Sequence, residues 1–423
     1  MSRPSVSCIA SASVNLMKNL MGAAIFSLPQ ALGRSSVLPG LITMFGVCVV
    51  QASSFVLIAV LCQQYGAKTY RGICSAAFGQ KSGRIVDFLI STNSFFICVA
   101  YQILVADFLQ KAVHGLFGWD SVSRSALIWG SMLTMTMPLS HVRNLSPLQY
   151  TSVMGLAIIV LVYLYIVSDC LENLDIARLN LGNNLMRIDM GIFSTLFLCT
   201  ETFQAHYNAP KFFRELGFDL RAHAYTTAVS FSGAFLIYSS FAVAGLGLFG
   251  SNILGNVLRN YPVQGDKAIL LAWLGMAFAI IFTYPLVFTT GRDSLISLVP
   301  QLRRMSKRHP NQMHVLLTCS VVAATATVGC FVDDVSRITE FLGATVGSCL
   351  CWILPAAVYL KSVLCCPTST ELESACEPLL PKMDMKVRQL PTAGGVLVAY
   401  TSGMVAVGCL AMSIGVSDVF GFI

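Results

Sequence analysis

The chain has 423 residues, of which 55% are hydrophobic and only 11% are charged, and its mean hydropathy is +0.71. Soluble domains carry about 25% charged residues, so this composition excludes a row of soluble domains and a disordered chain. The net charge of +7 comes from basic residues that are scattered between apolar runs, which argues against nucleic acid as a partner. The sequence predicts one all-α integral membrane protein with the lipid bilayer around it.

Eleven segments reach the length of about 20 mostly apolar residues that a membrane-spanning helix needs. They cover residues 9–32, 37–64, 85–110, 125–140, 147–168, 188–210, 223–249, 268–290, 313–331, 339–361 and 393–416. The predicted organisation is therefore a short cytoplasmic tail (1–8), a core of ten helices (9–361), a cytoplasmic linker (362–392) and an eleventh helix with the chain end (393–423). Because no small-residue cleavage site follows the first segment, we expect that helix to be retained.

The distribution of basic residues predicts the orientation of these helices. With the N-terminus in the cytoplasm, the inner loops hold more than twice as many Lys and Arg residues as the outer loops, as the positive-inside rule requires. The linker run Glu377-Pro378-Leu379-Leu380 loosely matches an acidic dileucine sorting signal but is one residue short. The plasma membrane and a vacuolar or lysosomal membrane therefore both remain open.

Motifs of enzymes do not occur in the sequence. It contains no His and Asp cluster with metal-ligand spacing, no nucleophile elbow and no glycine-rich phosphate loop. We therefore expect no enzymatic activity, no metal and no cofactor.

Two of the apolar segments carry signs of an interruption. In the first, Gly22 with its small neighbours and Pro29 would weaken a continuous helix. Unpaired backbone in a membrane is tolerated where it lines a cavity, and a close helix crossing at the small residues is the alternative. The sixth segment holds Glu201, Gln204 and His206 inside an apolar run, and ionisable groups there usually face an interior pathway.

The position of these interruptions suggests an architecture. The first and sixth segments each begin a set of five, and interrupted helices in corresponding positions of two halves indicate inverted repeats with a binding site at the midplane. The sequence predicts a five-plus-five repeat with one extra C-terminal helix.

Several runs of the chain resemble one family. The matching runs, in chain order, are Asn15–Pro29, Tyr101–Leu109, Tyr150–Ser152, Phe203–His206, Phe212–Leu216, Gly245–Gly250, Asn252–Leu254, Asn260–Pro262, Thr283–Pro285 with Arg292, Phe341–Ser348, Ile353–Pro355 and Tyr359–Lys361. They are similar to the amino acid/auxin permease family, most closely to its neutral and vacuolar amino acid transporter branches. The resemblance implies a LeuT-type fold with broken helices 1 and 6, and secondary transport of amino acids that is driven by protons or sodium or runs as exchange.

Three residues depart from the family pattern. Where the family has a second glycine, this chain has Ala24 after Gly22, so we expect a milder break. Lys18 stands where sodium-coupled relatives have Asn, which argues against sodium. Glu201 stands where neutral amino acid carriers usually have an aromatic residue, which opens cationic amino acids as substrates beside neutral ones.

An amino acid presents a carboxylate and an ammonium group to its site. We expect the carboxylate to bind backbone N–H groups next to Gly22 and Ala23, where the outer half-helix begins. The donors are those of Ala24, Ile25 and Phe26. Unwound carbonyls of the sixth segment would accept from the ammonium. These belong to Cys199, Thr200, Glu201 and Thr202, while Tyr101 and Phe203 either close over the substrate or pack in the core.

The coupling position is expected between the first and eighth segments. A sodium ion would need oxygen ligands near Asn19 and the hydroxyl of Thr283. Lys18 either replaces sodium as a tethered ammonium or extends to the interface. Glu201 binds a proton, pairs with a cationic substrate, or forms a salt bridge to Lys18. His206 either relays protons or packs in the core.

Two rival functions remain beside a proton-coupled or sodium-independent transporter. One is an amino acid sensor with little flux, which the very short N-terminal tail disfavours. The other is a sodium-coupled neutral amino acid symporter. In each case we expect the chain to act as a monomer.

Overall fold

The computed structural model describes residues 4–119, 122–143, 148–263, 267–364 and 395–419. All secondary structure in these ranges is helical. The predicted linker lies outside the described residues from residue 365 onward, whereas residues 362–364 are the end of a helix.

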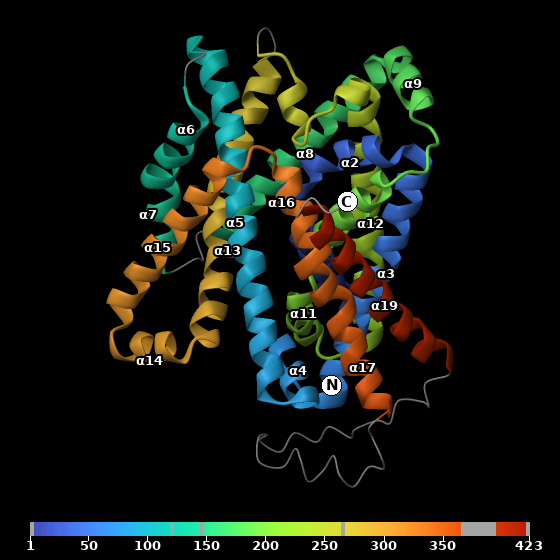
Figure 1. Cartoon of the computed structure of the whole chain (residues 1–423), viewed down its shortest axis with the longest axis vertical. Coiled ribbons are helices and arrows are strands. Elements are labelled where there is room, and N and C mark those ends of the chain that lie inside the picture. Colours follow the sequence, from blue (N-terminus) through green and yellow to red (C-terminus); the bar gives the residue numbers. More distant parts are fainter. Residues whose placement is uncertain (1–3, 120–121, 144–147, 264–266, 365–394, 420–423) are drawn as a thin grey trace.

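Long apolar helices form most of the molecule (Figure 1). They include α3 (Val37–Tyr65), α5 (Gln80–Phe117), α8 (Leu148–Glu172), α12 (Leu220–Phe249), α13 (Lys267–Leu298), α15 (Pro310–Phe331) and α19 (Gly395–Val419). In the described ranges, 8 helices are long and apolar enough to cross a membrane, or up to 9 when one bent pair is counted as a single span. The chain is a multi-pass integral membrane protein.

The remaining spans are interrupted. The first consists of α1 (Val6–Leu20), the 3-10 turn η1 (Ala23–Ser27) and α2 (Leu28–Ser35), and the sixth of α10 (Gly191–Thr202), the 3-10 turn η3 (His206–Asn208) and α11 (Ala209–Glu215). The two halves of the first span meet at a bend of 54°. Both predicted breaks are confirmed, and α1 begins within the range predicted as a tail.

Two more spans contain π-helical turns that the sequence analysis did not predict. The fourth joins α6 (Arg124–Ser131) to α7 (Met137–His141) through η2 (Met132–Thr136). The tenth joins α16 (Val335–Leu342) to α17 (Leu354–Leu364) through η6 (Gly343–Gly347) and η7 (Cys349–Ile353). Such turns re-aim the side chains around them and often occur at functional sites.

Short connecting segments distinguish the two ends of the molecule. They are α4 (Tyr70–Phe78), α9 (Leu174–Asn183), α14 (Pro300–Arg308), η4 (Gly250–Asn252) and η5 (Val257–Asn260). Figure 1 shows α4 and α14 at one end together with the end of α17, and α9 at the other end. We call the first the basic end, because α14 alone carries Arg303, Arg304, Lys307 and Arg308. The second is the opposite end.

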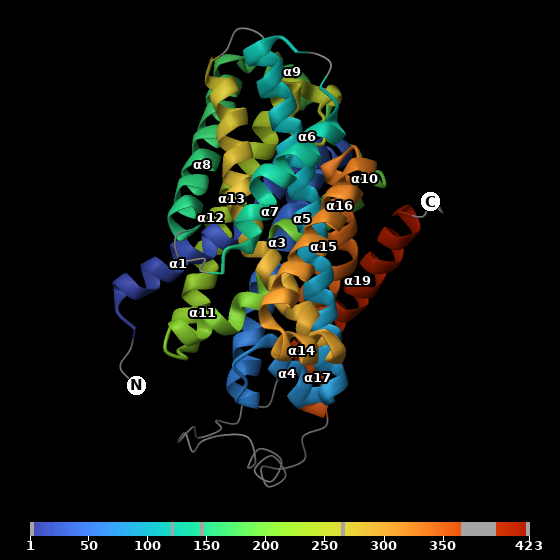
Figure 2. The same ribbon diagram turned by 90° about the vertical axis from the view of Figure 1, so that its left-hand side faces the viewer.

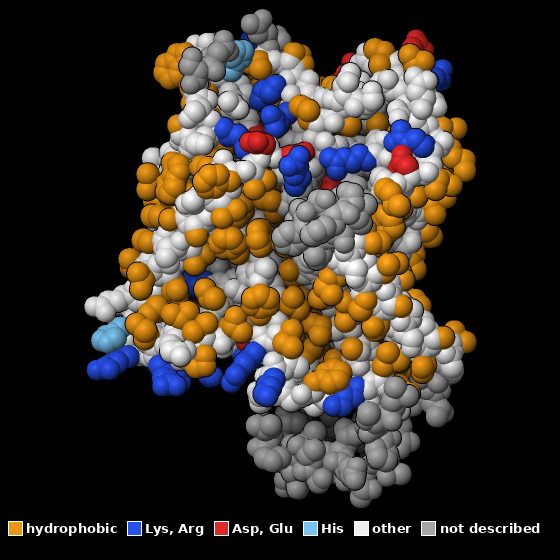
Figure 3. All heavy atoms as spheres, viewed as in Figure 1, with side chains coloured by type: hydrophobic (Ala, Val, Ile, Leu, Met, Phe, Trp, Pro, Cys, Tyr) orange, Lys and Arg blue, Asp and Glu red, His pale blue; other side chains and the backbone are white. Residues whose placement is uncertain are grey.

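The broken segments lie inside a frame of unbroken helices. Helix α5 packs along α13, and α3 packs against α12, while α10 lies against α2, α3 and α16. Figure 2 shows α1 and α11 on the side of the breaks that faces the basic end, with α10 beyond them. In Figure 3, hydrophobic side chains cover the middle of the visible face and Lys and Arg side chains line its lower edge. This is the surface expected of a protein that crosses a bilayer.

Candidate functional site

The break in the first span follows Leu20. Its carbonyl accepts a hydrogen bond from the Tyr238 hydroxyl of α12 at 2.7 Å, which replaces a lost helical bond. Gly22 adopts extended backbone, with φ −110° and ψ −178°, and a Cβ placed there would meet only the Leu20 carbonyl, at 3.9 Å. The break therefore forms although position 24 is alanine. It also needs no backbone conformation at position 22 that only glycine can adopt.

The break in the sixth span is held in a similar way from α3. The Gln51 side chain donates to the Thr200 carbonyl at 2.9 Å. The Phe203 and Gln204 N–H groups donate to the carbonyls of Cys199 and Glu201, each at 3.0 Å. Three of the four carbonyls predicted to bind an ammonium group thus already accept one hydrogen bond, which leaves them weaker acceptors for that group than a free carboxylate would be.

Glu201 is the carboxylate that lies at this break. Its Oε2 atom is buried and has no hydrogen-bond partner within the described residues. The carboxylate has one side-chain hydrogen bond, from Asn93 of α5, and it lies near the phenol groups of Tyr101 and Tyr207. No salt bridge in the described part of the chain joins Glu201 to Lys18. The predicted alternative of a structural Glu201–Lys18 pair is therefore not formed in this conformation.

Other unpartnered polar atoms gather around the same breaks. Buried polar groups in proteins nearly always have a partner, yet within the described residues these have none. We call them, with Glu201 Oε2, the polar cluster: Ser27 Oγ, Gln51 Oε1, Asn93 Oδ1, the Gln204 side-chain amide and His206 Nδ1. A group of unsatisfied donors and acceptors between two broken helices has the chemistry of a site for a small polar molecule.

His206 has a fixed orientation in this cluster. Its Nε2 lies 2.6 Å from the Ser54 hydroxyl and 3.2 Å from the Gln51 carbonyl. Ser54 donates its only proton to the Cys351 carbonyl at 2.5 Å, so Nε2 must be the donor toward Ser54. The neutral ring then presents the Nδ1 lone pair, which is the unpartnered atom.

The predicted aromatic residues have different surroundings. Phe203 is fully buried, with ring centroids 5.2 Å from Tyr238 and 6.1 Å from Phe231, so it packs on α12. Phe26 is buried as well and forms edge contacts with Phe108 and Phe241. Tyr101, beside Glu201, is the predicted aromatic residue that lies next to the carboxylate.

The predicted coupling residues are spread over a wider region. Thr283 donates within α13 to the Ala279 carbonyl at 2.8 Å. Asn19 is exposed and accepts from Asn208 at 3.2 Å. Lys18 is half-buried and forms no salt bridge with a described residue. No hydrogen bond within the described ranges joins Thr283 to either residue of α1.

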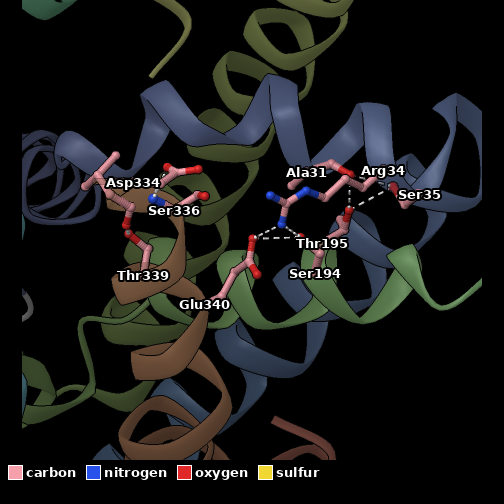
Figure 4. A network of polar contacts seen from close by, with 10 residues as sticks. Ala31, Arg34, Ser35, Ser194, Thr195, Asp334, Ser336, Thr339 and Glu340 are labelled. Carbon is pink, nitrogen blue, oxygen red and sulfur yellow. Dashed lines mark hydrogen bonds and ion pairs between the residues drawn. The ribbon is translucent and has the colours of Figure 1, made fainter. Parts of the chain in front are cut away.

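Residues on the far side of the breaks form a network that the sequence analysis missed (Figure 4). Arg34 of α2 donates to Glu340 of α16 at 2.8 Å, and Ser194 of α10 donates to the same oxygen at 2.8 Å. The next residue of α10, Thr195, has its Oγ1 2.9 Å from the Ala31 carbonyl and 2.8 Å from the Ser35 hydroxyl. This α2–α10–α16 network ties three half-helices together toward the opposite end.

Two glycines of the tenth span allow α10 to approach closely. A Cβ at Gly343 would lie 1.7 Å from the Phe197 carbonyl oxygen, and a Cβ at Gly347 would lie 3.1 Å from Gln204 Oε1. Real Cβ atoms essentially never come within 3.0 Å of another heavy atom, so a side chain at position 343 would separate the helices.

Accessibility differs between the two sides of the breaks. Toward the basic end, Asn19 is exposed and Lys18, Tyr207 and Asn208 are partly exposed. Toward the opposite end, Ile25 and Phe26 are each 1% exposed, beneath the α2–α10–α16 network. In this structure the site is closed on the network side.

A helical membrane protein with two broken helices around a polar cluster has the architecture of a secondary transporter. A family model described as transmembrane amino acid transporter protein matches residues 5–380, and the chain therefore belongs to this family. The family is one of transporters, not enzymes.

Relatives named as amino acid transporters support the assignment. The chain is 22% identical to Vacuolar amino acid transporter 2 of Saccharomyces cerevisiae over 355 residues, which cover 81% of this chain and 74% of the relative. It is 24% identical to Solute carrier family 38 member 8 of Mus musculus over 368 residues, which cover 82% and 83% of the two chains.

Solved structures share the fold at low sequence identity. Mhp1, a nucleobase-cation-symport-1 family transporter in a closed conformation with bromovinylhydantoin bound, matches with a TM-score of 0.58 and 13% identity over 96% of this chain and 90% of that one. MhsT in complex with L-phenylalanine matches with a TM-score of 0.53 and 13% identity over 97% and 100%. The predicted LeuT-type fold is confirmed.

Proposed function

We propose that this chain is a secondary active transporter that moves neutral or cationic amino acids across a membrane by alternating access, coupled to protons. The observation that carries the proposal is Glu201 Oε2, a buried carboxylate oxygen between the broken helices that has no partner in the described part of the chain. A carboxylate at such depth costs a few kcal/mol unless it is paired, hydrated or protonated. An ammonium group of the substrate or a proton supplies what it lacks.

The two breaks offer complementary groups to an amino acid. The substrate carboxylate would bind at the start of η1, where the first N–H groups of a helix have no helical acceptor and the dipole favours an anion. Of the predicted donors, the Ile25 N–H already donates to the Gly22 carbonyl at 3.4 Å, so the N–H groups before it are the ones left for the substrate. The ammonium, or the side chain of a cationic amino acid, would bind Glu201. Tyr101 lies beside Glu201, and the unpartnered side-chain amide of Gln204 follows three residues later in the same broken span.

Protons fit the coupling position better than sodium. Sodium needs several oxygen ligands at about 2.4 Å, whereas the Thr283 hydroxyl is directed at its own helix and Lys18 places a cationic group beside the break. The proton acceptors at hand are Glu201 and the Nδ1 atom of His206. No resident metal or cofactor takes part in this scheme, and the coupling ion is the proton.

Purified protein in liposomes, with a panel of radiolabelled amino acids and with pH and sodium gradients imposed separately, tests this function. We expect saturable uptake that increases with an inward proton gradient and is unchanged by sodium. Uptake that rises saturably with sodium at fixed pH would contradict proton coupling. Binding without uptake would identify a sensor.

Glu201→Gln sharpens the same experiment, because it keeps shape and hydrogen bonding and removes the charge. We expect proton-driven accumulation to fall at least 10-fold, which is the effect of about 1.4 kcal/mol, with exchange retained if Glu201 binds the proton. If Glu201 instead binds a cationic side chain, uptake of basic amino acids alone falls. Glu215→Gln, on the exposed face of α11, is the matched control. If Glu201→Gln takes up all amino acids as the native chain does, Glu201 is not part of the site.

The basic end is proposed to face the cytoplasm, with the N-terminus on that side, because Lys and Arg gather there. Relatives of this chain are named vacuolar transporters, and we propose a vacuolar or lysosomal membrane with the plasma membrane as the alternative. Protease accessibility of N-terminal tags in sealed vesicles and fluorescence localisation test these assignments. Light scattering of the purified protein tests the expected monomer.

A further inference from the structure

A cavity of about 460 Å³ lies at the basic end, between the start of α5 and helix α14. This volume is in the range of about 300–1,000 Å³ that is typical of small-molecule sites. Its lining contains five basic and no acidic residues among those described: Arg71, Gln80, Arg84, Ser297, Pro300, Arg303, Arg304 and Lys307. The cavity is separate from the polar cluster, since none of its lining residues belongs to a broken helix.

Four of the five basic groups are uncompensated. Arg71 is anchored, since its Nη1 donates to the buried Asp87 at 2.5 Å and to the Ser297 hydroxyl. The other four have neither a hydrogen bond nor an ion pair within the described residues. They are Arg84 of α5 and Arg303, Arg304 and Lys307 of α14, and all four are exposed. Two separate helices thus place positive charges around one cavity. These charges repel one another, and binding of an anion would relieve that repulsion.

The cavity lies at the depth of lipid headgroups. Ile85 and Phe88 follow Arg84 on α5 and are 53% and 55% exposed, and Met305 of α14 is 48% exposed. Exposed apolar residues directly beside basic ones mark the boundary between hydrocarbon and headgroups. Figure 3 shows the same boundary as a row of Lys and Arg side chains below the hydrophobic surface.

We propose that this cavity binds the headgroup of an inositol lipid that carries two or more phosphate groups in the leaflet at the basic end. Arginine forks match phosphate oxygens in pairs, and basic clusters beside membrane helices bind such lipids. A headgroup with a single net charge would leave most of the four cations unpaired. A bound polyphosphate would join the α4–α5 segment to the α13–α14 segment and stabilise the folded protein.

Thermal unfolding of the purified full chain tests the site, because a ligand that binds only the folded state raises the Tm with its concentration. The probes are a short-chain phosphatidylinositol bisphosphate, short-chain phosphatidylserine and phosphatidylcholine, and soluble inositol trisphosphate. We expect a saturable rise in Tm with the bisphosphate lipid and a much smaller response to the others. An equal response to phosphatidylserine would overturn specificity for a polyphosphate, and equally tight binding of inositol trisphosphate would overturn a lipid as the ligand.

Variants assign the binding to the cavity. The triple change Arg303→Gln, Arg304→Gln and Lys307→Gln should raise the apparent Kd of the bisphosphate lipid about 100-fold, at about 1 kcal/mol for each basic group. The matched control is the triple change Lys68→Gln, Arg214→Gln and Arg221→Gln. It removes three exposed charges that do not line the cavity, and it should bind like the native chain.

A single change on the other helix adds an independent check. Arg84→Gln should raise the apparent Kd about fivefold, which is the effect of removing one basic group. Unchanged binding by the α14 triple variant, or equal loss in the control variant, would overturn the proposal. Both sets of residues are exposed, so these variants are expected to fold.

Discussion

The α2–α10–α16 network and the polar cluster share helix α10 and have opposite states of hydrogen bonding. Along α10 they are about 10 Å apart, since seven residues at 1.5 Å each separate Ser194 from Glu201. In the network, Arg34, Ser194 and Glu340 bond to one another. In the polar cluster, buried donors and acceptors lack partners among the described residues. The hydrogen bonds of the first region are complete within the protein, whereas the second offers free donors and acceptors to the substrate that we propose for it.

The largest effect is expected from filling the space at the first break. Gly22→Leu should reduce uptake at least 100-fold, because a leucine would occupy the gap next to the N–H groups that bind the substrate carboxylate, with expression and membrane insertion retained. Gly22→Ala is the control and should transport nearly as the native chain does, since a Cβ there meets nothing closer than 3.9 Å. Radiolabel uptake in liposomes measures both, and normal flux through Gly22→Leu would show that Gly22 serves packing alone.

An intermediate effect is expected from the network. Arg34→Glu should replace the attraction to Glu340 by repulsion and favour opening toward the opposite end. The double variant Arg34→Glu with Glu340→Arg should restore the ion pair and the closed conformation. Because Arg34 is 40% exposed, the pair is partly screened and we expect uptake to change severalfold rather than to disappear. Labelling by a membrane-impermeant thiol reagent, in a chain whose only cysteine is Cys199, measures the opening. Equal labelling of the single and double variants would show that the Arg34–Glu340 pair does not control the opening.

The smallest effect is expected at Lys18. Lys18→Asn should weaken the pH response of uptake about two- to fivefold and admit some stimulation by sodium, because the lost ammonium group leaves an oxygen-lined space. Lys18→Met, which removes the charge without adding a ligand, should weaken the pH response without a sodium effect. Initial rates over a range of pH, with and without sodium, distinguish these outcomes. If neither variant alters the pH profile, Lys18 only extends to the interface.

Local signals predicted the breaks but could not identify the residues that hold them. Gly22 and the polar run around Glu201 stand out from apolar sequence, so both interruptions could be predicted. Gln51 and Tyr238 are single polar residues in otherwise apolar helices, and nothing in their own segments tells which carbonyl they reach. Their roles follow only from how α3 and α12 pack around the breaks.

Pairing of charges was equally hard to predict. Glu201 and Lys18 were expected at similar depth, and a salt bridge between them was one alternative. The structure instead gives Glu201 a hydrogen bond from Asn93 and separates it from Lys18. Arg34 and Glu340 are 306 positions apart, and their pair depends on the meeting of two half-helices from different repeats.

The contact at Gly343 fixes how closely the tenth span approaches α10. There the tenth span contacts the backbone of α10 at the Phe197 carbonyl rather than any side chain. A contact between backbones keeps its position when nearby side chains are exchanged, so the proposed substrate-binding side chains of Glu201 and Gln204 are not needed to hold α10 at this point. We therefore expect any larger residue at position 343 to displace α10, because the backbone at Phe197 cannot move aside as a flexible side chain would.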